Sequence, residues 1–187
     1  MEGREMVDID LDGMLRGLRS TDVEECRAAL EDSHELLAEG WADRRLLQAL
    51  IPLTAAEDDQ VRRDASWCIG KLALLKLGDP RSVGRLIALA ADPDEEVRSN
   101  AAWALGELAG LRIGDTASIE ALNALLTDED REVRGMAAWA LGRMAERMRI
   151  TSPASIPLLQ AMRREGSEYL RKGAEWSLER IERIRAR

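Results

Sequence analysis

The stretch Val97-Arg-Ser-Asn-Ala-Ala-Trp-Ala-Leu-Gly106 decides the fold, because the chain repeats it at regular intervals. Val61-Arg-Arg-Asp-Ala-Ser-Trp-Cys-Ile-Gly70 precedes it by 36 residues, and Val133-Arg-Gly-Met-Ala-Ala-Trp-Ala-Leu-Gly142 follows it after another 36. Two less regular copies complete the set: Cys26-Arg-Ala-Ala-Leu30 and Leu170-Arg-Lys-Gly-Ala-Glu-Trp-Ser-Leu-Glu179. In the copy that begins at Cys26, Asp32 takes the position of the tryptophan. Five copies at spacings of 35 to 37 residues indicate a repeat architecture.

Each copy is preceded by a second apolar pattern with spacings of three and four, which predicts an amphipathic helix A. Within the copy itself, Val97, Ala101, Leu105 and Leu108 follow the same rule and predict a second helix, B. Such a helix pair cannot bury its apolar faces alone, so neighbouring pairs must stack. The recurring apolar positions of helix A are Leu15 and Leu18, Leu50 and Leu53, Leu86 and Leu89, Leu122 and Leu125, and Leu159 and Met162.

Turn residues separate these helices. Acidic turns such as Asp92-Pro93-Asp94 stand between A and B and supply N-caps, whereas Gly78 and Gly114 follow B and are predicted to stop it. The prediction is a single domain, 1–187, whose first and last repeats act as caps. The repeat bounds are approximately 8–40, 41–78, 79–114, 115–151 and 152–187.

The composition agrees with a helical, aliphatic core. Hydrophobic residues make up 45% of the 187 residues, aromatic residues only 3%, and Phe is absent. No run of 18 apolar residues occurs, which excludes a membrane-spanning helix. Cys26 and Cys68 form no CxxC pair and are expected to be buried free thiols, so a cytoplasmic location is predicted.

The net charge of −8 is unevenly distributed. Residues 1–60 contain 16 acidic and 6 basic side chains, whereas residues 143–187 contain 6 acidic and 11 basic ones. The chain therefore runs from an acidic end to a basic end. This gradient permits a homodimer in which the acidic section of one copy meets the basic section of another.

The phrase Asp-Pro-Asp-Glu-Glu-Val-Arg-x-x-Ala-Ala-x-Ala-Leu-Gly, residues 92–106, resembles the short HEAT-like repeats of the phycobilisome-lyase type. The similarity covers residues 44–180 well and 10–40 weakly. It implies an all-α, right-handed α-solenoid whose B helices line the inner, concave surface. One departure is an extra stretch that helix B is expected to carry before the loop, at Leu74–Leu77, Gly110–Ile113 and Glu146–Ile150. The family hosts many unrelated roles, so the resemblance implies a fold and leaves function open.

A tryptophan recurs on the side of helix B that faces away from the A/B core. Successive helices pack about 8–10 Å apart, so these rings are predicted to form a ladder. One interpretation is a binding groove for a peptide, a helix or a sister molecule; the other is packing between repeats, with cation–π contacts. The candidate partner-binding residues are Trp67, Trp103, Trp139 and Trp176, with their neighbours Asp64, Lys71, Asn100, Glu107, Met136, Arg143 and Arg180.

A row of arginines also recurs, at Arg62, Arg98, Arg134 and Arg171. These side chains are predicted to pair with carboxylates of the acidic turns between helices A and B. The candidate carboxylates are Asp58, Asp94 and Asp130.

The expected function is a non-catalytic scaffold for a protein or peptide, with no cofactor and no metal. A single histidine, His34, cannot supply the di-iron site of HEAT-like deoxyhypusine hydroxylases, which needs repeated His-Glu pairs. Acidic side chains such as Asp64 and Glu107 argue against a glycosylase-like nucleic-acid binder. That binder and a phycobilin-lyase-like, chromophore-handling protein are the alternatives, and no phosphate-loop or nucleophile motif singles out a catalytic residue.

Overall fold

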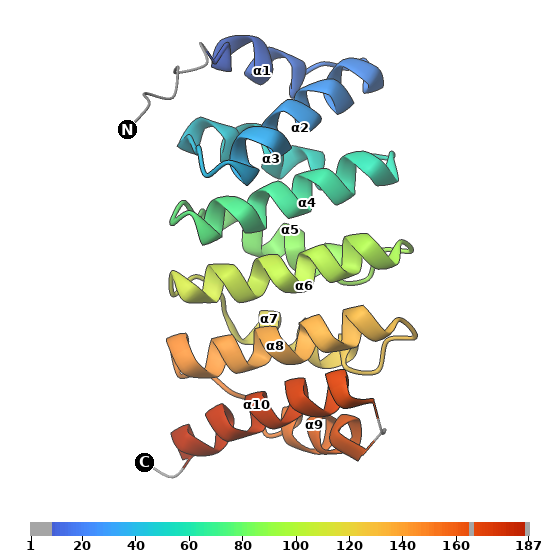
Figure 1. The fold of residues 1–187 in the computed structure, drawn as a ribbon, viewed down its shortest axis with the longest axis vertical. Coiled ribbons are helices and arrows are strands. Elements are labelled where there is room, and N and C mark those ends of the chain that lie inside the picture. Colours follow the sequence, from blue (N-terminus) through green and yellow to red (C-terminus); the bar gives the residue numbers. More distant parts are fainter. Residues whose placement is uncertain (1–8, 165–166, 186–187) are drawn as a thin grey trace, which may run out of the picture.

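The computed structural model describes residues 9–164 and 167–185 of the chain. Within these residues short and long helices alternate, and one of each kind forms a repeat (Figure 1). The short A helices are α1 (Leu11–Gly17), α3 (Arg44–Leu53), α5 (Arg81–Leu89), α7 (Thr116–Leu125) and α9 (Ser155–Arg164). The long B helices are α2 (Val23–Ala38), α4 (Asp59–Leu74), α6 (Glu95–Gly110), α8 (Arg131–Met148) and α10 (Glu168–Arg185).

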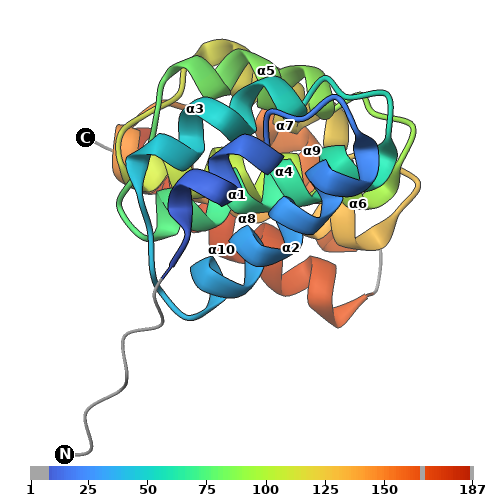
Figure 2. The same ribbon diagram turned by 90° about the horizontal axis from the view of Figure 1, so that it is seen from above.

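The helix pairs stack into an α-solenoid, which confirms the fold predicted from the repeats. Figure 1 shows the B helices lying one above another, with α1 and α10 at opposite ends of the stack. Seen along the stack, α3 and α5 occupy one side and α2 and α10 the other (Figure 2). Each B helix packs against the next B helix along its length, whereas successive A helices meet at few residues. We call the outward side of the B helices the B face.

The core consists of the aliphatic residues that the sequence pattern selects. Val97, Ala101, Leu105 and Leu108 have no exposed surface, and in the A helices Leu50, Leu86, Leu122 and Leu159 are equally buried. Leu53 is only partly buried. The buried side of helix B is thus confirmed. Among the described residues, no helix has the length and apolarity needed to cross a membrane.

Aspartate N-caps set the register of the B helices. The side chains of Asp22, Asp58, Asp94 and Asp130 each accept hydrogen bonds from backbone N–H groups of the first turn that follows. These caps stand 36 residues apart, so the first repeat has the same length as its neighbours. The spacing of 35 that the weak sequence copy indicated for it is therefore wrong, and His34 takes the place that Gly70 has in α4.

The helix ends also differ from the prediction, because glycine does not terminate α4 or α6. Lys76 and Arg112 adopt the left-handed conformation, with φ of 70° and 61°. The next residues close the turn: Leu77 N–H donates to Leu72 O over 2.8 Å, and Ile113 N–H donates to the carbonyl of Leu108 over 3.0 Å. The half-buried Leu77 and Ile113 side chains anchor these turns, as a C-terminal Schellman motif requires. The extra stretch expected in helix B is thus mainly this turn after α4 and α6, whereas α8 continues as helix to Met148.

Arginine side chains link successive repeats on the edge where the A–B turns lie. Arg98 forms a two-pronged pair with Asp128 of the next repeat, at 2.7 and 2.9 Å. Its remaining nitrogen donates to the carbonyls of Asp92 and Pro93 in its own turn. Arg62 repeats this arrangement with Asp92.

The carboxylates expected to pair with these arginines have different partners. Asp58 pairs with Arg27 and Asp94 pairs with Arg63, each at 2.6 Å. The arginines pair instead with Asp92 and Asp128, two positions before the predicted Asp94 and Asp130. Asp58 and Asp94 are N-caps and face the side of the turn nearer the B face. The Arg63 hydrogen bond lowers the pKa of Asp94 to about 2.

Candidate binding groove on the B face

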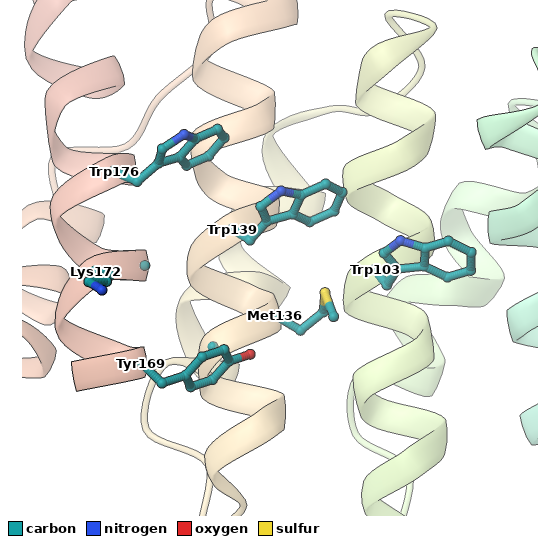
Figure 3. Close-up of a pocket in the computed structure, with 8 residues that line it drawn as sticks. Trp103, Met136, Trp139, Tyr169, Lys172 and Trp176 are labelled. Carbon is teal, nitrogen blue, oxygen red and sulfur yellow. The ribbon is translucent and has the colours of Figure 1, made fainter. Parts of the chain in front are cut away.

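The tryptophan rings of the later repeats lean on the preceding B helix. Figure 3 shows Trp103, Trp139 and Trp176 pointing the same way along the stack. A Cβ atom added at Gly70 would lie 2.6 Å from the Trp103 ring, and one at Gly106 would clash with Trp139 in the same manner. Each ring thus packs between repeats, on a surface that exists because the facing residue is glycine.

The first tryptophan of the ladder has no such glycine beneath it. Because α2 carries His34 at that position, the imidazole stacks on the Trp67 ring with centroids 3.7 Å apart and an interplanar angle of 30°. Trp67 in turn lies 6.2 Å from the Trp103 centroid. Lys71 completes the group with its Nζ 5.9 Å from the Trp67 centroid. These residues form a closed stack.

Polar side chains surround the closed stack. Asp64 accepts hydrogen bonds of 3.0 Å from the Gln60 amide, and the Asn100 amide donates to the Arg63 carbonyl over 3.2 Å. The pocket between these residues and Trp67 has a volume of about 300 Å³. Asp64 and Asn100, both predicted to bind a partner, are therefore engaged within the protein in this small polar pocket.

The C-terminal part of the B face is open and apolar. A groove of about 570 Å³ runs over α6, α8 and α10 (Figure 3). Its size falls within the range of ligand pockets, about 300–1,000 Å³. The lining residues are Trp103, Gly135, Met136, Trp139, Tyr169, Lys172, Gly173 and Trp176.

Arginine guanidinium groups lie over two of these rings. The Arg180 guanidinium lies 3.5 Å from the Trp176 centroid, and that of Arg143 lies 5.2 Å from Trp139. Arg143 also pairs with Glu107 at 3.2 Å. Glu107 is only 6% exposed, so its assignment to the partner-binding set is wrong. Its carboxylate is buried and paired with Arg143 of the next repeat.

Four groove residues escaped the sequence analysis: Gly135, Tyr169, Lys172 and Gly173. Tyr169 occupies the position held by Glu96 and Glu132 in earlier repeats, and its ring covers Gly135. Burial, with Glu132 nearby, raises the pKa of its phenol. The signal for this residue was available, since it is the only tyrosine in the chain and directly precedes the repeated apolar position.

The fold and this groove define the protein as an α-solenoid with an aromatic face. The family model for HEAT repeats matches residues 46–111 and 85–179. Because these matches cover most of the sequence, the chain belongs to the HEAT-repeat family. A search of curated proteins found no match.

Solved structures share the fold at low sequence identity. An engineered protein, Northeast Structural Genomics Consortium target OR329, has a TM-score of 0.74 and 24% identity over 91% of this chain and 78% of its own. Computationally designed armadillo repeat proteins for modular peptide recognition give 0.68 and 22%, over 92% and 82%. The complex of CpcE and CpcF of phycocyanin lyase from Nostoc sp. PCC7120 gives 0.72 and 19%, over 98% and 69%.

Proposed function

We propose that this protein is a non-catalytic scaffold that binds a protein or peptide partner in the groove on its B face. The observation that carries the proposal is that the tryptophans of one row differ in how much the protein itself covers them. Trp67 is stacked under His34, whereas Trp139 and Trp176 border an open apolar groove. An apolar hollow that residues 9–164 and 167–185 leave unfilled is the kind of surface that marks interaction sites.

The chemistry of the walls fits recognition better than catalysis. Indole and phenol groups provide large contact areas with few rotatable bonds, and Trp and Tyr dominate the energy of many interfaces. The flexible methionine thioether can adapt its shape to a partner. The charged group in the lining, Lys172, is exposed and paired with Glu168 at 2.6 Å. Among the described residues, no cluster of His, Cys, Asp or Glu side chains is arranged to hold a metal ion.

The relatives support this assignment by analogy of fold. One structural neighbour is a designed protein for modular peptide recognition, and another is a complex between two solenoid chains of phycocyanin lyase. The first is designed for peptide recognition, and the second is a complex of CpcE with CpcF. A protein partner is therefore the natural occupant to test first.

The test is affinity capture from a lysate of the source organism with wild type and two charge variants. Met136→Glu places a carboxylate in the groove without removing a ladder tryptophan, and Arg85→Glu alters an exposed residue of α5, on the layer of A helices. We expect a specific protein to be held by wild type and by Arg85→Glu but lost by Met136→Glu. Retention of the same protein by Met136→Glu would show that the groove is not the binding site.

A further inference from the structure

Gly173 gives the groove a socket that nothing in the described chain fills. It lies within α10, where glycine costs about 0.5–1 kcal/mol relative to alanine. A Cβ atom added there would meet no atom within 4 Å, whereas one at Gly135 would run into the Tyr169 ring. Packing thus explains Gly135 and leaves Gly173 unexplained.

The side chains that flank this socket are aromatic. Tyr169 and Trp176 stand four residues before and three residues after Gly173, so they flank it on one face of α10. Met136 and Trp139 line the same groove farther along, and their side chains extend from α8 away from α10 (Figure 3). The open space beside Gly173 can therefore take an apolar side chain between Tyr169 and Trp176.

Unused hydrogen-bond donors border the same groove. The indole N–H groups of Trp103, Trp139 and Trp176 have no acceptor in the described part of the chain, and Figure 3 shows the three nitrogens on the same side of their rings. None of these nitrogens is among the buried atoms that lack a partner, so they are open to solvent and free to donate to a ligand. Backbone carbonyls of an extended peptide, which are not used within the peptide itself, are acceptors that such a row can bind.

The charges near the groove favour an acidic ligand. Lys172 lines the groove, and the Arg131 guanidinium lies 5.9 Å from the Tyr169 centroid. Their present partners, Glu168 and Glu132, form exposed ion pairs, which contribute little and exchange readily. The surrounding section, residues 143–187, has 11 basic and 6 acidic side chains.

The other end of the same face repels such a ligand. The polar pocket beside Trp67 contains Asp64 and Glu96, and its one arginine, Arg63, is already paired with Asp94 and Glu96. Residues 1–60 have 16 acidic and 6 basic side chains. An acidic segment therefore has a single favourable place along the B face, over α8 and α10.

We propose that the groove binds an extended, acidic peptide segment of the partner, with one bulky apolar side chain inserted beside Gly173. Carboxylates of the peptide pair with Lys172 and Arg131, and its carbonyls accept from the indole N–H groups. This inference rests on the proposed scaffold function and specifies the chemistry of the partner.

The experiment is selection of binders from a displayed library of short random peptides, followed by affinity measurements on variants. Selected peptides should contain more Asp and Glu than Lys and Arg, together with a shared bulky apolar residue. Gly173→Leu fills the socket and should weaken their binding about 30-fold, as loss of a hot-spot contact does, whereas Gly84→Leu on exposed α5 should not. Lys172→Glu should weaken it about 3- to 10-fold and reduce its salt dependence, whereas Arg85→Glu should do neither.

Each other outcome overturns the inference. Neutral or basic binders refute the charge assignment, and equal binding to the Gly173→Leu variant places the site elsewhere. An empty selection refutes a peptide occupant. The proposed scaffold function is tested separately. If wild type captures a protein that Met136→Glu does not, and no acidic peptide displaces it, the scaffold function is supported and the acidic-peptide partner is refuted.

Discussion

The two halves of the B face carry the same tryptophan row and differ in everything around it. At the N-terminal half, Arg63 reaches across to Asp94, and His34 stacks on Trp67. At the C-terminal half, Ser99 and Gly135 stand where Arg63 stands, 36 and 72 residues later. Long side chains close the first half, and their replacement by small ones opens the second.

The comparison shows that a repeated residue does not have a repeated role. Every ladder tryptophan packs between repeats, so the structural interpretation of the ladder holds throughout. Whether the outer face of a ring is also available depends on its neighbours, which change from Asp64 and Asn100 to Met136 and Gly173 along one row. Packing and binding are therefore compatible in the second half and not in the first.

The largest test of this contrast is the loss of an indole from each half. Trp67→Ala should lower the free energy of unfolding by about 3 kcal/mol, because its ring stacks on His34 and lies beside Trp103. Trp176→Ala should cost about 1–2 kcal/mol, since that ring borders the open groove. Urea unfolding monitored by circular dichroism measures both, and equal losses would remove the distinction between the halves.

A somewhat smaller loss is expected where a ring meets glycine. Gly106→Ala places a methyl group against the Trp139 ring and close to the Ala140 backbone. Overpacking of this kind costs about 1–3 kcal/mol, which exceeds the gain in helix propensity. Thermal and urea unfolding should both show the loss of stability. A variant as stable as wild type would mean that α8 shifts relative to α6 and accommodates the methyl group at no cost in free energy.

The ion pair that closes the first half predicts a pH dependence. Arg63 holds the Asp94 pKa at about 2, below its ordinary value, so the stabilisation is complete above about pH 4 and is lost as the pH falls through about 2. Asp94→Asn preserves the N-cap but should cost about 1 kcal/mol at neutral pH, after allowance for solvent screening. It should also flatten the acid limb of stability against pH.

The matched control for this pair is Asp130→Asn. Asp130 caps α8 in the same way, but Ser99 stands at the position of Arg63. Urea unfolding across the acid range should therefore show a smaller change than for Asp94→Asn. Identical acid limbs would indicate that the Arg63 pair contributes nothing specific.

The smallest effect has the opposite sign. Gly173→Ala should raise the free energy of unfolding by about 0.5–1 kcal/mol, because alanine favours the helix and the added methyl group meets open space. Gly84→Ala in exposed α5 is the reference, since its Cβ is equally free. If differential scanning calorimetry shows Gly173→Ala to be destabilised while Gly84→Ala is not, the socket is already filled in solution.

Much of the molecule follows from sequence periodicity alone. The spacing of Val61, Val97 and Val133 determines the repeat, and the 3.6-residue period of a helix then assigns Val97 and Leu105 to the core and Trp103 to the opposite side. These inferences succeed because helix geometry is local: which residues share a face depends on spacing along the chain.

Contacts between repeats were decided only by the tertiary structure. Sequence spacing could not show that Glu107 is buried under Arg143, that His34 covers Trp67, or that Gly173 faces open space, because each depends on how far one helix is displaced along its neighbour. That displacement results from many small packing contacts together. The sequence by itself thus determined the solenoid and its tryptophan row, and the packing of one repeat on the next decided which part of that row is open.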